Sequence, residues 1–300
     1  MPFKAICLMI CSLCVAVDAA ALEICGDLKQ GELLYLKHDS SENNKNKVLI
    51  YNNLGEKIYS SDELNRTPLA LHRNAEKNVN FIVYDEYGNS RKYSLQVKPT
   101  VWDIQRINGV VQSKVTPTSD ADLAEIKREQ GDVNRVLAAT KSDKLQSDID
   151  NNYFWNEGFI LPVEGRISGH FGNQRIFNGT PKSPHSGTDI AAPEGTPVKA
   201  SGSGVIVLSG KDYFFTGNMV IIDHGHQLQT IYAHLQKATV KVGDKVRQGD
   251  TIGYVGKTGR ATGAHLHWGA SLNNVRFRPH SLLDIKAKKC IRLEENKEDK

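Results

Sequence analysis

Two glycine-rich stretches in the C-terminal half decide the fold: residues 195–210 read GTPVKASGSGVIVLSG and residues 240–256 read VKVGDKVRQGDTIGYVG. In both stretches, short runs of β-branched residues alternate with glycines, which is typical of strands joined by tight turns. No long amphipathic helical pattern interrupts the chain from Phe159 onward. We therefore predict a C-terminal domain over residues 153–285 that is mostly antiparallel sheet.

The N-terminal half shows a second β pattern. Short segments rich in Val, Ile and Tyr, such as VLIYN at residues 48–52 and FIVYDEYG at residues 81–88, are separated by Asn, Gly and Asp. This composition is typical of strands and turns. We therefore expect a small β domain over residues 22–115, and a protein that is mostly β overall.

Residues 116–152 separate the two β patterns and predict a helix. Pro117 and Ser119 precede apolar residues at helical spacing. Gly131 interrupts the pattern, and we expect the helix to fray there. We interpret the segment as a helical linker between the domains, with a partner-binding surface as the alternative, and residues 286–300 as a charged C-terminal tail.

The first 21 residues predict an export signal. Lys4 supplies a positive charge, residues 5–17 form an apolar run, and residues 19–21 are three alanines that suit a cleavage site. The apolar run is shorter than the roughly 20 residues that span a bilayer, and an uncleaved anchor is the alternative. We expect the mature protein to be exported, either to the periplasm or out of the cell.

Cysteine and charge content narrow the function classes further. Removal of the signal would leave Cys25 and Cys290, which could form a disulfide in an oxidising compartment, with two unrelated thiols as the alternative. The formal net charge is +4 and no long block of Lys and Arg occurs, so no nucleic-acid partner is expected. The sequence leaves the oligomeric state open.

A constellation of histidines and one aspartate forms the candidate site. Its members are His185 and Asp189 in PHSGTD, His234 in YAHL, and His265 and His267 in GAHLHWG. Residues two apart on a strand point to the same face, so His265 and His267 would share a surface. In an extended chain His185 and Asp189 would lie roughly 13 Å apart, too far to bind one ion, so we expect a bend at Gly187.

Two histidines and one carboxylate suit a catalytic zinc site, which uses three protein ligands and leaves a position for water. No cysteine lies near these residues, which excludes a closed structural site of the Cys type. Zinc lowers the pKa of bound water to about 7. His234 and His265 are the candidates for the base that guides the proton, because the intrinsic pKa of histidine is about 6.5.

This pattern resembles the LytM/lysostaphin-type zinc metallopeptidases, in their exported proteobacterial branch. The resemblance covers about residues 159–279 and is carried by His-x-x-x-Asp, by the histidine of YAHL and by His-x-His within GRATGAHLHWG at residues 259–269. By position it implies one zinc ion and five site residues. The implied zinc ligands are His185, Asp189 and His267, and the implied catalytic residues are His234 and His265.

The resemblance also implies a fold and a function. The metal would lie in a groove between β-sheets, and the protein would be a zinc-dependent endopeptidase that hydrolyses peptide cross-links of peptidoglycan. The alternative is a non-catalytic LytM-type activator of a cell-wall amidase, although such relatives typically lack ligands that are present here. Cleavage of a protein substrate is a further alternative.

One feature of some relatives is missing. A tyrosine shortly before their first ligand is thought to stabilise the oxyanion, whereas this chain reads FGNQRIFNG at residues 171–179. His265 in its protonated form, His234 and Arg175 are the remaining candidates for that role.

The other histidines are interpreted as structural: His38, His72, His170, His224, His226 and His280. For His224 and His226, which lie in the polar turn DHGHQ, we expect solvated or turn-capping side chains. The N-terminal domain carries no catalytic motif. We expect it to cover the substrate groove as an inhibitory domain, with targeting to partner proteins or the cell wall as the alternative.

Overall fold

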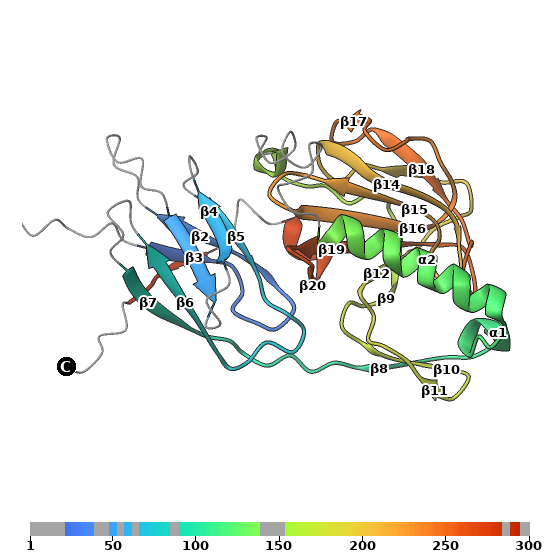
Figure 1. Ribbon diagram of the computed structural model, residues 1–300, viewed down its shortest axis with the longest axis horizontal. Coiled ribbons are helices and arrows are strands. Elements are labelled where there is room, and N and C mark those ends of the chain that lie inside the picture. The colour runs from blue at the N-terminus through green and yellow to red at the C-terminus, as the bar shows by residue number, and fades with distance from the viewer. Residues whose placement is uncertain are drawn as a thin grey trace, which may run out of the picture.

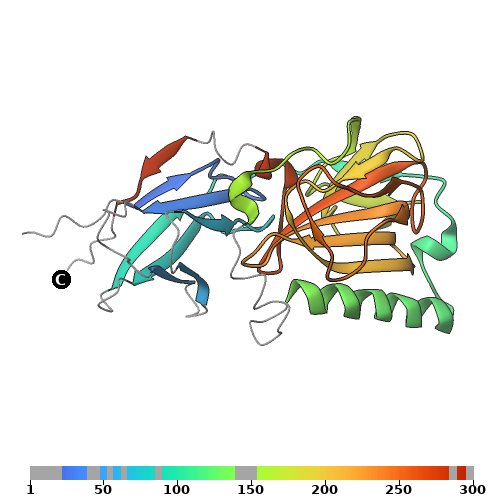
Figure 2. The same ribbon diagram turned by 90° about the horizontal axis from the view of Figure 1, so that it is seen from above.

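The computed structural model describes residues 22–38, 48–52, 57–61, 66–84, 90–138, 154–283 and 289–294. It is mostly β-structure, as predicted, and its strands form two bodies that lie side by side (Figures 1 and 2). The predicted export signal and the ends of the predicted linker and tail fall outside the described residues. No helix in the described ranges is both long and apolar enough to cross a membrane.

The N-terminal body is a sandwich of two four-stranded antiparallel sheets. In order across each sheet, the first contains β21 (Cys290–Arg292), β1 (Leu22–Cys25), β2 (Leu33–His38) and β5 (Arg66–Ala70), and the second contains β4 (Lys57–Ser61), β3 (Val48–Asn52), β6 (Asn78–Tyr84) and β7 (Ser90–Gln96). Leu34 of β2 meets Phe81 of β6 and Leu95 of β7 in one apolar core. The Val-, Ile- and Tyr-rich segments of the sequence thus form the predicted strands.

Strand β2 is buried on both faces and joins the two bodies. Leu34 and Leu36 face the N-terminal core. Leu33 and Tyr35, which alternate with them along the strand, pack in the core of the C-terminal body. The Tyr35 ring stacks on Trp155 with 6.0 Å between centroids. The two bodies are therefore packed against each other through apolar side chains.

The C-terminal segment returns to the N-terminal body. Strand β21 pairs antiparallel with β1, and the expected disulfide joins Cys25 to Cys290 at this pairing. Nearby, Arg278 donates two hydrogen bonds of 2.7 and 2.9 Å to the buried carboxylate of Glu32. The predicted tail therefore contains a strand, β21, of the N-terminal sheet. The sequence did not indicate this strand, because its pairing partner β1 is distant in the chain.

The C-terminal body is built on a ten-stranded antiparallel sheet. Its main path runs through β17 (Lys245–Val246), β14 (Gly204–Tyr213), β15 (Gly217–Asp223), β16 (Leu228–Ala238), β19 (His265–Leu272), β12 (Gly187–Ala191) and β9 (Arg166–Gly169), and β13 (Pro197–Lys199), β18 (Thr251–Val255) and β20 (Val275–Phe277) pair off this path. Two 3₁₀ turns, η1 (Phe154–Glu157) and η2 (Pro279–Leu282), flank it. Between β19 and β20, Asn273 and Asn274 have φ of 48° and 64°, as a tight two-residue hairpin requires.

A small fourth sheet adds a strand from the N-terminal half. It consists of β11 (Thr180–Pro181), β10 (Gln174–Phe177) and β8 (Ile104–Ile107), and β8 runs parallel to β10. After β8, Val110 and Val115 pack on Phe177. Residues 104–115 therefore lie against the C-terminal body, although the sequence placed them in the N-terminal domain.

The helix predicted within residues 116–152 is present as α2 (Asp120–Leu137), which lies across one face of the C-terminal sheet (Figures 1 and 2). A short helix that was not predicted, α1 (Gln112–Val115), precedes it. The side chain of Ser119 caps α2 by accepting a hydrogen bond from the backbone N–H of Asp122. The expected fraying at Gly131 was wrong, because α2 is continuous there. Leu137 packs on apolar residues of the sheet, which include Met219. Packing of this kind outweighs the low helix propensity of glycine.

The contact of α2 with the sheet gives a prediction for stability. Leu137 is 2% exposed, and Leu123 on the same helix is 48% exposed. Leu137→Ala should lower the free energy of unfolding by about 2–5 kcal/mol, because it removes buried methyl groups and leaves a cavity. Leu123→Ala, the matched control, should cost about 0.5 kcal/mol or less. Urea unfolding of both variants measures the difference, and equal costs would contradict this account of α2.

Candidate metal centre and active site

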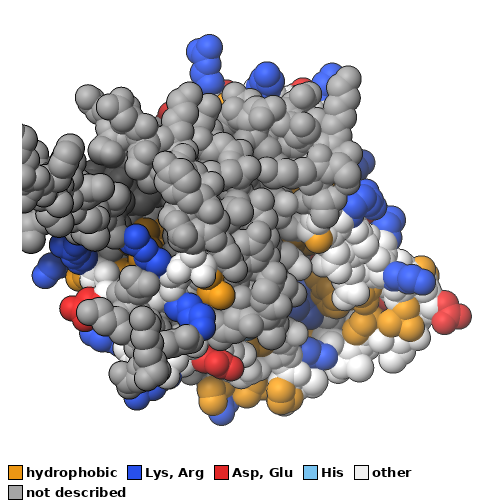
Figure 3. Space-filling view, turned by 60° about the vertical axis from the view of Figure 1, so that its left-hand side comes forward, with side chains coloured by type: hydrophobic (Ala, Val, Ile, Leu, Met, Phe, Trp, Pro, Cys, Tyr) orange, Lys and Arg blue, Asp and Glu red, His pale blue; other side chains and the backbone are white. Residues whose placement is uncertain are grey.

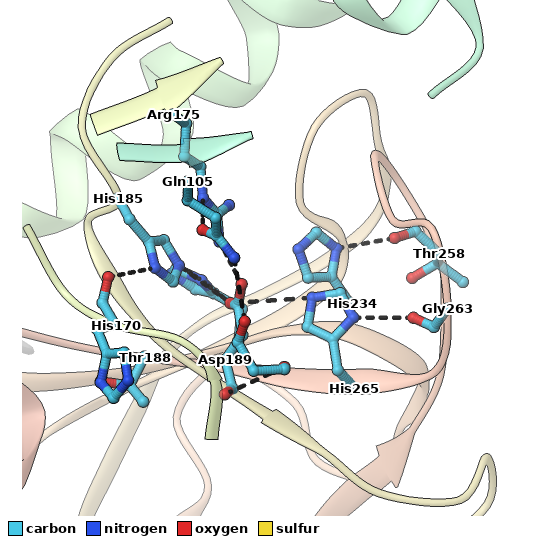
Figure 4. A network of polar contacts seen from close by, with 12 residues as sticks. Gln105, His170, Arg175, His185, Thr188, Asp189, His234, Thr258, Gly263 and His265 are labelled. Carbon is cyan, nitrogen blue, oxygen red and sulfur yellow. Dashed lines mark hydrogen bonds and ion pairs between the residues drawn. The ribbon is translucent and has the colours of Figure 1, made fainter. Parts of the chain in front are cut away.

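Three neighbouring strands bring the candidate residues together. In the register of the sheet, Asp189 on β12 pairs with His267 on β19, and His267 pairs in turn with Ala233 on β16. His265 lies two residues before His267 and so on the same face of the sheet. His234 directly follows Ala233. Figure 4 shows the side chains of Asp189, His234 and His265 turned toward one centre, with His185 beside them.

The proposed ligand atoms lie in a tight triangle. The Nε2 atom of His185 and the Nδ1 atom of His267 are each 3.0 Å from Oδ1 of Asp189, and 3.0 Å from each other. All three residues are buried. Zinc bonds of about 2.0–2.1 Å in tetrahedral geometry place ligand atoms about 3.3 Å apart, so the triangle fits a zinc ion after small shifts.

The bend between His185 and Asp189 exists, but Gly187 serves it in an unexpected way. A Cβ atom at Gly187 would lie 2.5 Å from the carbonyl oxygen of Trp268 and 2.7 Å from Nε2 of His267. Glycine is needed for this close approach of β12 to β19. The chain before it is fixed by a hydrogen bond of 2.9 Å from the backbone N–H of His185 to the carbonyl of Asn173.

Backbone carbonyls fix the tautomers of three rings. The Nδ1 atom lies 2.9 Å from the His170 carbonyl in His185, 2.9 Å from the Thr258 carbonyl in His234 and 2.8 Å from the Gly263 carbonyl in His265. A carbonyl only accepts hydrogen bonds, so each Nδ1 carries the proton. In the neutral ring, Nε2 is then left with a lone pair, free to bind a metal or to accept a proton.

His234 has an unusual backbone. Its φ is 61°, and its N–H donates to the carbonyl of Thr216 at 2.9 Å. The register between β15 and β16 shifts at this point, as at a β-bulge. A left-handed histidine within a strand is strained, and such strain at a site turns a side chain in a direction that a regular strand does not allow. The ring of His234 lies 4.7 Å from that of His265 between centroids.

Burial sets the charge state of the site. Loss of solvation, together with the neighbouring His265 and His267, lowers the pKa of His234 to about 3. Loss of solvation also lowers the pKa of His267 to about 4, against the pull of Asp189. Burial alone would raise the pKa of Asp189, but His185 and His267 hold it well below its usual range. Neutral rings around one carboxylate are the protonation state that metal binding needs.

Two further side chains reach the centre. Arg175 contacts Oδ2 of Asp189, on the side away from the ligand triangle. Its Nε–H donates to the side-chain carbonyl of Gln105 at 3.2 Å (Figure 4). Gln105 lies on β8, and no pattern in the sequence marked it. Arg175 was a candidate for oxyanion stabilisation, and here its guanidinium is engaged with a ligand.

The sequence around this site is similar to that of known peptidases. Residues 183–279 match the sequence model of peptidase family M23. The C-terminal body carries an M23 peptidase domain. The chain is 48% identical over 129 residues to peptidoglycan DD-endopeptidase ShyA of Vibrio cholerae, which covers 40% of this chain and 30% of that protein. It is 47% identical over 98 residues to DD-carboxypeptidase/endopeptidase Mpg of Neisseria meningitidis, covering 33% and 22%.

The structure has a neighbour that extends beyond the M23 domain. A crystal structure of a candidate peptidase M23 from Pseudomonas aeruginosa superposes with a TM-score of 0.62 and 26% identity, over 86% of this chain and 96% of that one. The chain spans less than a third of the length of the two curated relatives. The likeness to these two relatives therefore concerns the M23 domain.

The remaining histidines lie outside the ligand triangle. His170 orients His185 through its carbonyl, His280 lies 3.5 Å from the hydroxyl of Thr188, and Nδ1 of His72 accepts from the N–H of Asn74. Nothing is described for the side chain of His38. These positions support the structural interpretation.

His224 departs from expectation, because it is fully buried within the M23 domain and not solvated. Its Nδ1–H donates to the Ser203 carbonyl, and its Nε2 accepts from the hydroxyl of Thr230, both at 2.7 Å. The Thr230 oxygen lies 2.9 Å from the hydroxyl of Tyr232. The ring therefore completes a buried network in its neutral form.

This burial predicts a loss of stability in acid. Burial lowers the pKa of His224 from 6.5 to about 4, so between these values the unfolded chain binds a proton that the folded protein does not. Stability is then lost as the pH falls through that range, by about 2 kcal/mol from pH 7.5 to pH 5. His224→Gln should show a pH dependence flatter by about this amount in urea unfolding at the two pH values. An unchanged difference between pH 7.5 and pH 5 would refute the assignment.

Proposed function

We propose that this protein is an exported, zinc-dependent endopeptidase that hydrolyses peptide cross-links of peptidoglycan. The observation that carries the proposal is the convergence of His185, Asp189 and His267 on one point, with His234 and His265 beside them. A zinc ion held by the three ligands would polarise the scissile carbonyl and acidify a water molecule. A domain that only activates an amidase would need neither the ligands nor the two free imidazoles.

His234 and His265 provide the proton transfers. Both present an unprotonated Nε2, because Nδ1 of each ring donates to a backbone carbonyl. Either Nε2 can accept the proton of the attacking water and return it to the leaving amine. An unprotonated Nε2 donates no hydrogen bond, so a histidine stabilises the oxyanion only after it has taken up a proton.

For an exported Gram-negative protein, the bond proposed for cleavage is the D-Ala–diaminopimelate cross-link of the cell wall. Relatives that match the M23 domain are named DD-endopeptidase and DD-carboxypeptidase/endopeptidase, which supports a bond between two D-centres. Mass analysis of fragments released from isolated cell wall by the zinc-loaded chain would name the bond. Fragments with intact cross-links would contradict the proposal.

Substitutions should separate the two roles within the site. His185→Ala, Asp189→Ala or His267→Ala should abolish cell-wall hydrolysis and reduce bound zinc, because each removes one of three ligands. His265→Ala and His234→Ala should retain zinc yet lose about 10²- to 10⁴-fold in rate, since they remove proton transfer and not metal binding. Zinc content by atomic absorption, measured beside the hydrolysis rate, distinguishes the groups.

His170→Ala is the matched control for these variants. The contact of His170 with the site is made by its backbone carbonyl, which alanine keeps. The variant should retain zinc and rate. A ligand variant with stoichiometric zinc and the parental rate would remove that residue from the ligand set, and a metal-free His265→Ala would move His265 into it.

Whether the N-terminal domain inhibits or targets the enzyme stays a prediction, and the structure indicates where a truncated chain that tests it should begin. Among the described residues that line the cavity at the site, those from the N-terminal half are Gln105 and Ile107, both on β8. A chain that begins near Tyr153 would lose α2 and expose the apolar face that Leu137 covers. The shortened chain should therefore begin near Thr100, and because it lacks Leu33 and Tyr35 of the shared core, its folding is checked by circular dichroism before rates are compared.

If the N-terminal domain targets the enzyme to the wall, the full and the shortened chain should differ in wall binding and not in hydrolysis rate. The full mature chain should hydrolyse soluble cross-linked fragments without prior proteolysis, and the chain from Thr100 should do so at an equal rate but bind intact wall less. Hydrolysis rates and wall sedimentation measure these two properties. A marked rise in rate on soluble fragments after truncation would instead identify an inhibitory domain.

A further inference from the structure

A cavity of about 310 Å³ opens beside the ligand triangle and is strongly cationic. Three arginines line it: Arg166, Arg175 and Arg260. Among its described lining residues, Asp189 is the single acidic group. His265 lies on the same wall, so a peptide placed for hydrolysis would pass these guanidinium groups.

The three arginines differ in their partners. Arg175 is neutralised by its contact with Asp189. Arg166 is exposed, where solvent and salt weaken its interactions. Arg260 is partly buried and has no carboxylate within ion-pair distance among the residues that the structure describes. Of the three, Arg260 is thus the shielded cation without a described carboxylate in direct contact, although the charge of Glu129 acts on it from farther away.

The guanidinium of Arg260 is held in place by aromatic rings. It lies 4.6 Å from the ring centroid of Phe177 and 4.4 Å from that of Phe215. Its backbone N–H donates to the carbonyl of Phe215 at 2.8 Å, and one side-chain N–H reaches the carbonyl of Lys114 at 3.4 Å. Stacking on rings orients the planar group and leaves its other N–H donors free.

The surroundings oppose the charge of Arg260. Burial and, to a smaller extent, the nearby Arg175 lower its pKa to about 10, against the opposing effect of Glu129. The group still carries its proton at neutral pH. Shielded charges in proteins are normally paired, and a planar guanidinium is suited to two parallel hydrogen bonds with a carboxylate.

We propose that Arg260 binds a carboxylate of the substrate peptide next to the scissile amide, and so selects peptides that carry one. This deepens the proposed function and rests on it. A carboxylate on the carbon that bears the scissile nitrogen is present where the leaving amine belongs to the D-centre of a diamino acid. Arg260 acts here as a specificity-determining residue and makes no proton transfer.

The test compares two synthetic cross-link peptides that differ in one group. In one, the residue after the scissile amide has a free carboxylate, and in the other this group is a primary carboxamide. Binding is measured by calorimetry to the full, zinc-loaded chain in a His265→Ala background, which slows cleavage. We expect the carboxylate peptide to bind about 10- to 100-fold more tightly, as charge-assisted hydrogen bonds at a shielded site provide.

Three variants in the same background assign the effect. Arg260→Gln should bind both peptides equally. Arg260→Met, which keeps an apolar stem between Phe177 and Phe215, should do the same and serves if the Gln variant fails to fold. Arg166→Gln removes the same charge from the exposed rim of the cavity and should keep the preference.

Two results would overturn the proposal. One is equal binding of the two peptides by the chain that retains Arg260. The other is a preference that survives Arg260→Met, and its loss in Arg166→Gln would assign it to the rim of the cavity instead. The proposed function is judged separately, since a zinc-loaded chain that hydrolyses neither cell wall nor the peptides refutes it whatever the binding shows.

Discussion

One buried carboxylate, that of Asp189, is the interaction on which the site depends. Removing a carboxylate from water is costly unless hydrogen bonds and opposite charges replace the solvent. Asp189 divides these partners between its two oxygens: Oδ2 contacts Arg175, and Oδ1 faces His185 and His267. Because burial keeps the pKa of His267 low, this ring stays neutral and does not compete with a cation for Oδ1. The charge left on Oδ1 is thus directed toward the ligand triangle.

Glycines on the neighbouring strands make room for this arrangement. A Cβ atom at Gly169 on β9 would lie 2.7 Å from Oδ2 of Asp189 and 3.1 Å from the guanidinium of Arg175. Gly187 does the same on the other side, where β12 approaches His267. The contact of Asp189 with Arg175 therefore requires a bare backbone on β9. In this region, the glycines allow the close approach of side chains at the site, in addition to the tight turns that the sequence predicted.

The sequence predicted those parts of the molecule that follow from local spacing. The alternation in HLH places His265 and His267 on one face, and the strand-and-turn composition predicted the mostly β fold, because both depend on neighbours in the chain. The left-handed backbone of His234, the contact of Gln105 with Arg175 and the burial of His224 were missed. Each arises from contacts between distant segments, which leave no periodic pattern in either segment.

The residues that surround the site come from inside and from outside the range that matches the family model. The three proposed ligands and the two imidazoles beside them, five residues in all, lie within the range that matches the M23 model, residues 183–279. Arg260 lies in that range too, but two groups that hold it, Phe177 of β10 and Lys114 of α1, lie outside it. Gln105 of β8, which holds the neighbouring Arg175, also lies outside it. The segment 104–115 therefore shapes the cationic wall, and Gln105 reaches the proposed ligand Asp189 only indirectly, through Arg175. Of the two arginines, a change at Lys114 would bear on Arg260 alone, whereas a change at Gln105 would also bear on Asp189 through Arg175.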